Sequence, residues 1–160
     1  IYEGTTAIQA NDLVGRKTAR DGGQTAKGIA AQVAETEAAL VASGSAQALA
    51  VAKRLKAARE AFLDVVDFVA GKTKAEPNAV FAGSVPYLML AGNLVAGWQL
   101  ARSLRVAEEQ LAAGVDTAFM QAKIATAHFY AEHLLNKAPG IRDSIVDGAA
   151  SVTALALESF

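Results

Sequence analysis

Apolar side chains recur every three or four residues over most of this chain, the spacing of one face of an α-helix. The clearest stripe lies in residues 46–70, where the recurring positions are Val51, Leu55, Ala58, Phe62, Val65 or Val66, and Val69. No segment alternates apolar and polar residues as a half-buried strand does. The pattern therefore predicts an all-α protein with helices over residues 5–20, 24–42, 46–70, 79–113, 117–137 and 141–158.

Within these helices the spacing also predicts which side chains face inward. Ile8, Leu13 and Val14 share one side of the first helix, and Ile145, Ala149, Val152 and Leu155 share one side of the last. In the second helix Ile29, Val33, Thr36 and Leu40 form the stripe, with Glu35 and Glu37 elsewhere. Met120, Ile124, Ala127, Ala131 and Leu134 line the helix over 117–137.

Glycine and proline mark the helix ends. Asp21-Gly22-Gly23 and Ser43-Gly44-Ser45 end the first two helices, and Pro139-Gly140 is expected to break the chain before the last. Pro86 predicts either a kink or a helix that begins near it. Because the connections are short, we expect an antiparallel up-and-down bundle of about four long helices, preceded by one short helical segment.

Glycines, a tryptophan and an arginine in the helix predicted over 79–113 indicate specific tertiary contacts. Gly83, Gly92 and Gly97 are costly within a helix, so we expect them to let neighbouring helices approach closely. Trp98 is interpreted as a packing anchor, with ligand stacking as the alternative. Arg102, one turn beyond, is placed to pair with a buried acid or carbonyl.

Composition excludes several classes of function. The formal net charge of the 160 residues is −1, which gives no general attraction to nucleic acid or to an anionic membrane. The absence of cysteine excludes disulfides and thiolate metal sites and is compatible with a cytoplasmic protein. Residues 79–101 carry no charge and reach the ~20 residues of a membrane span. Their glycine, serine, proline and asparagine content instead predicts a buried helix, with no span.

A cluster of basic side chains lies in the helix over 46–70: Lys53, Arg54, Lys56 and Arg59. One interpretation is a site for an acidic partner or for the phosphates of coenzyme A. The favoured interpretation is a solvated outer surface, because no aromatic residues interleave for base stacking.

The two histidines do not have the spacing of a metal site. His128 and His133 are five residues apart, which places them on different helix faces, unlike the i, i+4 pair of a helical zinc site. We therefore predict no metal. The chain also contains no phosphate-binding glycine-rich motif and no convincing Ser/His/Asp set.

The strongest candidates for a catalytic or ligand-binding site are the residues Tyr2-Glu3-Gly4-Thr5. Gly4 permits a close approach of the backbone to a ligand, and Thr5 or Thr6 can cap the helix that follows. Free amides at that helix start suit an anionic group such as a pyrophosphate. A carboxylate at Glu3, held beside a buried flat cofactor, can serve as a base. On these residue types alone, a solvated loop carboxylate is the favoured interpretation of Glu3.

The same residues carry a family resemblance. Tyr2-Glu3-Gly4-Thr5, then Ile8-Gln9, then residues 11–17 (Asn-Asp-Leu-Val-Gly-Arg-Lys) resemble the C-terminal signature of the FAD-dependent acyl-CoA dehydrogenases. The likeness is to the long bacterial branch with an extra C-terminal helical domain, which includes 3-methylmercaptopropionyl-CoA dehydrogenase-like enzymes. The resemblance implies that Glu3 is the catalytic base and that Gly4 and Thr5 lie against FAD. Many family members have Gln or Asn where this chain has Ala7, which lacks that contact.

The resemblance also implies a domain organisation. Residues 1–22 would be the end of the catalytic α-domain, and residues 23–160 would be the appended helical bundle, which 87–92 and 123–135 also resemble. The chain would then be the C-terminal part of an enzyme that oxidises an acyl-CoA to the 2-enoyl-CoA and passes electrons to an electron-transfer flavoprotein. A homo-oligomeric enzyme is expected, with this part inactive alone.

Two alternatives come from other classes. The bundle can be a non-catalytic structural or interaction module that stabilises the oligomer or covers the active site. An unrelated ligand-binding bundle would require the motif to be a coincidence.

Overall fold

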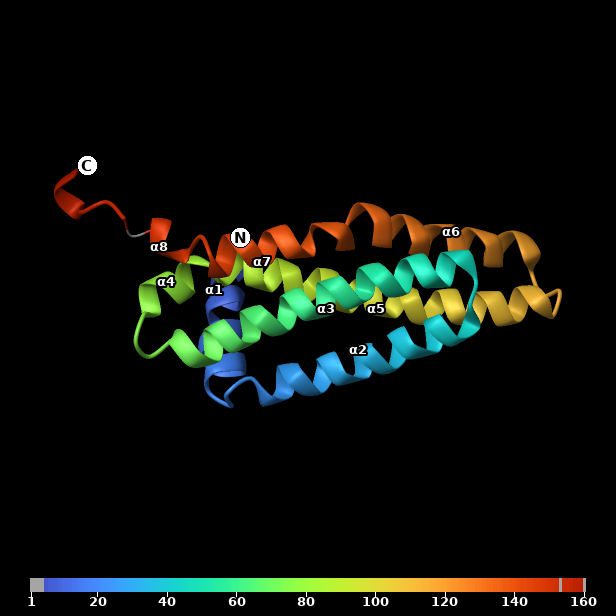
Figure 1. The fold of residues 1–160 in the computed structure, drawn as a ribbon, viewed down its shortest axis with the longest axis horizontal. Helices are drawn as coiled ribbons and strands as arrows, with labels where there is room; N and C mark the ends of the chain where they lie inside the picture. The colour runs from blue at the N-terminus through green and yellow to red at the C-terminus, as the bar shows by residue number, and fades with distance from the viewer. Residues whose placement is uncertain (1–4, 153, 160) are drawn as a thin grey trace.

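Four long helices form the body of the molecule in a computed structural model, which describes residues 5–152 and 154–159. They are α2 (Gln24–Ser43), α3 (Ala46–Lys72), α5 (Ser84–Ala112) and α6 (Thr117–His133). Figure 1 shows them running lengthwise beside one another. The described residues include no strand, so the all-α prediction is confirmed.

Shorter elements occupy the ends of this bundle. The N-terminal segment consists of α1 (Thr5–Asp12) and a π-helix, η1 (Leu13–Ala19). Between α3 and α5 lies α4 (Pro77–Ala82). After α6 come the 3₁₀-helix η2 (Leu135–Lys137), α7 (Ala138–Val146), α8 (Ala149–Val152) and the 3₁₀-helix η3 (Leu157–Ser159). In Figure 1, α6 and α7 follow one another along one edge of the bundle.

Helix α3 lies at the centre of the core. Its predicted stripe is buried throughout, with Val51, Leu55 and Val69 no more than 1% exposed. The helix begins at a cap, because Ser45 Oγ accepts a hydrogen bond from the backbone N–H of Ala48 at 3.0 Å. Gly44, with φ of 75°, ends α2 directly before it in the left-handed conformation that favours glycine. Capping residues therefore place the α2–α3 turn where the sequence predicted it.

The long uncharged segment is divided by Gly83. The structure ends α4 at Ala82 and begins α5 at Ser84, so Pro86 lies in the first turn of α5, where a missing N–H costs little. This agrees with the prediction of a helix beginning near Pro86. Among the described helices, none combines the length and the hydropathy that a membrane span requires.

Two of the three glycines predicted to permit close helix approach do so. An added Cβ at Gly97 would lie 2.6 Å from Leu135 Cδ1, and one at Gly83 would lie 2.8 Å from Ile145 Cγ2. At Gly92 an added Cβ would meet nothing within 4 Å, so the prediction is wrong there. The α5 backbone therefore approaches η2 and α7 closely at specific points.

The C-terminal third departs from the sequence prediction. Pro139 and Gly140 do not break the chain but lie in the first turn of α7, which tolerates proline. The helix ends at Val146, and the N–H groups of Asp147 and Gly148 both donate to the Asp143 carbonyl at 3.0 Å.

Beyond this stop the predicted inward face continues only as far as Ala149 of the short helix α8, which is 7% exposed. Val152 and Leu155, predicted to face the core, are 63% and 64% exposed.

Candidate functional site

The N-terminal motif segment leads into helix α1, which contacts α5 near one end of the bundle (blue in Figure 1). Ala10 of α1 and Val14 of η1 are fully buried, and they attach the segment to the bundle. Ile8 is 65% exposed, so its predicted inward position is wrong: it lies away from the face that carries Ala10. Thr5, at the first position of α1, is exposed. Glu3 and Gly4 lie outside the described residues, so their roles remain predictions.

A buried hydrogen bond anchors η1 to the bundle. Thr18 Oγ1 and the Tyr87 hydroxyl of α5 are 2.9 Å apart, and both residues are 1% exposed. Burial raises the pKa of Tyr87, so the phenol stays neutral and available to share this bond. The pair joins residues distant in sequence, which periodicity alone does not reveal.

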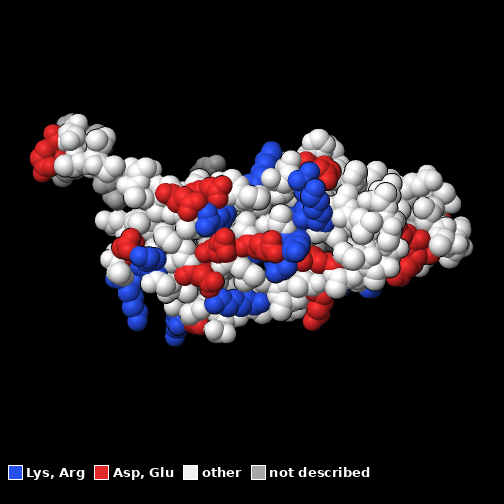
Figure 2. Space-filling model, in the orientation of Figure 1, with Lys and Arg blue, Asp and Glu red and all other residues white. Residues whose placement is uncertain are grey.

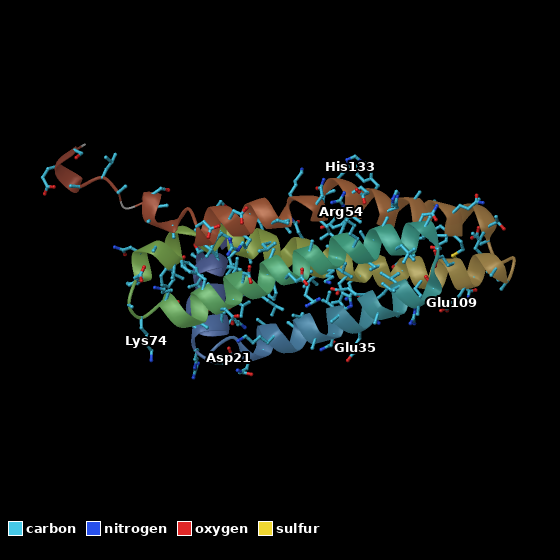
Figure 3. The ribbon with its side chains drawn as sticks, viewed as in Figure 1. Asp21, Glu35, Arg54, Lys74, Glu109 and His133 are labelled. Atoms are coloured by element: carbon cyan, nitrogen blue, oxygen red, sulfur yellow. The ribbon has the colours of Figure 1, made fainter. Side chains whose placement is uncertain are left out.

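The turn between η1 and α2 is held by Asp21, labelled in Figure 3. Its carboxylate accepts hydrogen bonds from the backbone N–H groups of Gly23 at 2.9 Å and Thr25 at 3.0 Å. A hydrogen bond from the Thr25 side chain contributes most to lowering the pKa of Asp21, and the backbone N–H groups of Thr25 and Gly23 lower it further. Gly23 has φ of 80°, which favours glycine. The helix stop predicted at Asp21-Gly22-Gly23 is confirmed.

A cavity of about 350 Å³ lies beside this anchored segment, lined by residues of α1, η1, α2, α3 and α5. We call it the η1 cavity. Most of its lining is apolar, including Leu13, Ile29, Phe62, Tyr87 and Leu94, with Asp12 and Lys17 among the few charged lining residues. Sequence reasoning missed this cavity because its wall combines residues from separate segments.

The basic cluster of α3 is not an open patch of four cations. Arg59 donates from Nε to Glu37 Oε1 at 2.7 Å and from Nη2 to Glu37 Oε2 at 3.0 Å. The predicted position of Glu37 away from the inward face is wrong, since it is only 8% exposed. Arg54 likewise reaches Glu132 of α6 at 2.8 Å, and its hydrogen bonds lower the pKa of Glu132.

Two arginines of this cluster are thus interhelical ties, whereas Lys53 and Lys56 are exposed as expected. Figure 3 shows Arg54 on α3 near the edge formed by α6. In Figure 2 acidic and basic side chains are interspersed over the visible face instead of being separated by sign. The arrangement favours helix packing over binding of a polyanion.

Trp98 packs between helices, as its interpretation as a packing anchor predicted. It is half-buried, and its Nε1 donates to Thr36 Oγ1 of α2 at 2.7 Å. Arg102 does not pair with a buried group: its guanidinium lies 5.6 Å from the Trp98 ring centroid and donates to the exposed Gln99 Oε1 at 3.0 Å. The residues around Trp98 therefore tie α5 to α2.

The histidines lie apart from any cluster of ligating side chains. His133 is exposed and stacks on Phe129, with ring centroids 4.4 Å apart. Throughout residues 5–152 and 154–159, no three His, Cys, Asp or Glu side chains are grouped to hold a metal ion.

Comparison with known proteins identifies the family of this chain. Residues 25–156 match the family described as "Acetyl-CoA dehydrogenase C-terminal like". The chain belongs to this family. It is 48% identical, over 98% of its length, to the 3-methylmercaptopropionyl-CoA dehydrogenase of Ruegeria pomeroyi, of which it covers 26%. It is 34% identical, over 91% of its length, to the broad-specificity linear acyl-CoA dehydrogenase FadE5 of Mycobacterium tuberculosis, of which it covers 25%.

The chain thus spans about a quarter of the length of these two relatives. The resemblance to the C-terminal part of the acyl-CoA dehydrogenases is confirmed.

Proposed function

We propose that this chain forms the C-terminal part of an FAD-dependent acyl-CoA dehydrogenase that oxidises an acyl-CoA to the 2-enoyl-CoA. The observation that carries the proposal is the 48% identity over 98% of the chain to an enzyme named for acyl-CoA dehydrogenation. In this proposal, residues 1–22 end the catalytic α-domain and residues 23–160 form the appended bundle. The family match, which begins at residue 25 just beyond the Asp21 turn, supports this division.

Glu3 is proposed as the base that removes the proton from C2 of the acyl thioester. FAD, when bound, would supply the acceptor for the hydride that leaves C3. A carboxylate suits the role of Glu3, because a base near a water-poor cofactor site acts with a raised pKa. An enzyme of this kind would pass its electrons to an electron-transfer flavoprotein and form a homo-oligomer.

Gly4 and Thr5 are proposed to lie against FAD, and the described part of the segment fits an anionic cofactor. Helix α1 spans Thr5–Asp12, and its first turn carries no acidic side chain. The partial positive charge at the N-terminal end of a helix suits phosphate groups. Ala7 is exposed but offers no side-chain donor, which leaves this contact to the backbone. Most of the flavin site would be supplied by other domains, so this chain alone would be inactive.

Substitution of Glu3 by glutamine in the full-length enzyme tests the base role. A general base contributes about 10²–10⁴-fold to rate, so steady-state turnover should fall by this factor while flavin content is unchanged. Glu35→Gln provides the matched control, because Glu35 is an exposed acid of α2. Turnover unchanged by Glu3→Gln would remove Glu3 from the role of base.

A second function is favoured by the outer surface of α5. Val85, Met89 and Val95 are 38%, 53% and 40% exposed within a segment that carries no charge, and Ile8 of α1 is also exposed. Apolar surface of this kind is typical of protein interfaces. The bundle can thus stabilise the assembly of the enzyme or cover its active site. Deletion of residues 24–160 that left assembly, stability and turnover intact would refute this module role.

A further inference from the structure

The walls of the η1 cavity have the composition of a small-molecule site. Phe62 and Leu94 at the cavity are 5% and 1% exposed, and the half-buried Leu13 and Ile29 complete its apolar lining. A volume of about 350 Å³ lies within the range of roughly 300–1,000 Å³ typical of ligand pockets. The residues Leu13 to Ala19 form a π-helix, a distortion that occurs frequently at functional sites.

The buried hydroxyl groups of the cavity wall already have a partner. The hydroxyls of Thr18 and Tyr87 share a 2.9 Å hydrogen bond. Across the part of the chain that the structure describes, no buried side-chain nitrogen or oxygen lacks a hydrogen-bond partner. Gln9 and Thr25, the other uncharged polar lining residues, are exposed. Deep inside the cavity a polar ligand group would therefore find few hydrogen-bond partners, whereas an alkyl chain would gain from burial.

The rim of the cavity adds a charge. Asp12 is neutralised by Arg16, whose Nη1 lies 3.0 Å from Asp12 Oδ1. Lys17 is exposed and, among the described residues, has no carboxylate within ion-pair distance. The lining residues thus leave one cation at the rim for an anionic group on a bound molecule.

We propose that the η1 cavity binds an amphiphile with an unbranched alkyl chain and an anionic head group, with the chain inside the cavity and the head group at Lys17. This binding does not depend on the proposed dehydrogenation and uses none of Glu3, Gly4 and Thr5, although Leu13 and Lys17 lie in the segment assigned to the catalytic α-domain. Each buried methylene contributes about 0.8 kcal/mol, so affinity should rise about fourfold with each added carbon. The increase should stop once the chain fills the cavity.

Titration calorimetry of the 160-residue chain with alkyl carboxylates from hexanoate to dodecanoate tests the chain-length dependence. Binding should carry a negative heat-capacity change, which marks burial of apolar surface. Decyl sulfate should bind as decanoate does, whereas decanol and decylamine should bind more weakly. Equal affinity for all four head groups, or affinity that does not depend on chain length, would overturn the proposal.

Two pairs of variants locate the site. Ala91→Phe places a ring in the cavity, since half-buried Ala91 lines it, and should weaken decanoate binding by about tenfold or more. Ala96→Phe is the matched control, because exposed Ala96 lies on the same helix outside the lining. Thermal melts verify that both variants fold. Decanoate binding that Ala91→Phe leaves unchanged would overturn the proposal.

Lys17 provides a test that does not perturb packing. Lys17→Met should weaken decanoate binding about two- to fivefold, the value of an exposed charge pair, and leave decanol binding unchanged. Lys17→Arg should restore the affinity for decanoate. An equal loss for decanoate and decanol in Lys17→Met would contradict the role assigned to the rim.

Discussion

Substitution by alanine should have opposite effects on stability at two glycines of α5, Gly97 and Gly92. At Gly97 an alanine Cβ would lie 2.6, 2.8 and 3.0 Å from Cδ1, Cδ2 and Cγ of Leu135, well inside ordinary contact. Leu135 is only 1% exposed, so its side chain has little free space into which to move. Overpacking of this kind lowers the free energy of unfolding by about 1–3 kcal/mol, and the higher helix propensity of alanine offsets about 1 kcal/mol of this loss. Gly97→Ala should therefore lower the free energy of unfolding by about 1 kcal/mol.

Gly92→Ala serves as the matched control on the same helix. An added Cβ there meets nothing within 4 Å, so only the propensity gain remains and stability should rise by up to about 1 kcal/mol. In a chain of this size, each kcal/mol shifts the melting temperature by roughly 2–4 °C. Thermal unfolding followed by circular dichroism should thus move Tm down for Gly97→Ala and up for Gly92→Ala.

A double-mutant cycle isolates the contact. In a Leu135→Ala background the clash is absent, so Gly97→Ala should become neutral or stabilising. A Gly97→Ala variant as stable as Gly92→Ala in the wild-type background would refute the close approach of α5 to η2. A destabilisation by Gly97→Ala that persists after Leu135 is truncated would refute it equally.

Three further predictions concern charge and cofactor. Glu37→Gln deprives the Arg59 guanidinium of its carboxylate partner, and because the Glu37 and Arg59 side chains are only 11% and 17% exposed, denaturant unfolding should show a loss of about 2–3 kcal/mol. Glu76→Gln, at a pair about half exposed, should cost no more than about 1 kcal/mol, and equal losses would contradict the assigned burial. The hydrogen bonds from Arg54 lower the pKa of Glu132 below its ordinary value of 4.5. Its stabilisation is therefore complete above that value and is lost as the pH falls through the lowered pKa of the folded state. The Tm difference between wild type and Glu132→Gln should shrink across that acid range, and a pH-independent difference would refute the linkage. The purified 16.5 kDa chain, verified by intact mass, should show no flavin absorption bands, and stoichiometric flavin would contradict the assignment of most of its site to other domains.

Periodicity predicted the bundle well where a helix ends at a strong local signal. The inner stripe of α3 and the stops at Gly22-Gly23 and Gly44 follow from local chemistry, so residues near in sequence were sufficient to find them. Periodicity failed beyond Ala149, because α7 ends at Val146 and α8 at Val152 while the apolar spacing continues to Leu155. A repeating pattern identifies a face only as far as the helix extends.

The tertiary contacts of the candidate sites could not be predicted from the sequence pattern. Glu37 was assigned away from the inward face on its charge, yet it is buried because Arg59 on α3 supplies both hydrogen bonds. The Thr18–Tyr87 bond and the η1 cavity likewise depend on which helices meet. A single sequence identifies such residues individually, but it does not show which residues contact one another in the folded protein. Glu3, by contrast, was found by motif resemblance and still rests on it.

The role of Glu3 is tested most directly by the rate of flavin bleaching when the full-length holoenzyme is mixed with an acyl-CoA in the absence of oxygen. We expect rapid bleaching in the wild type and in Glu35→Gln, and bleaching slower by about 10²–10⁴-fold in Glu3→Gln. Acyl-CoA binding should be retained in all three proteins. Bleaching of Glu3→Gln at the wild-type rate would contradict the assignment of Glu3 as the base.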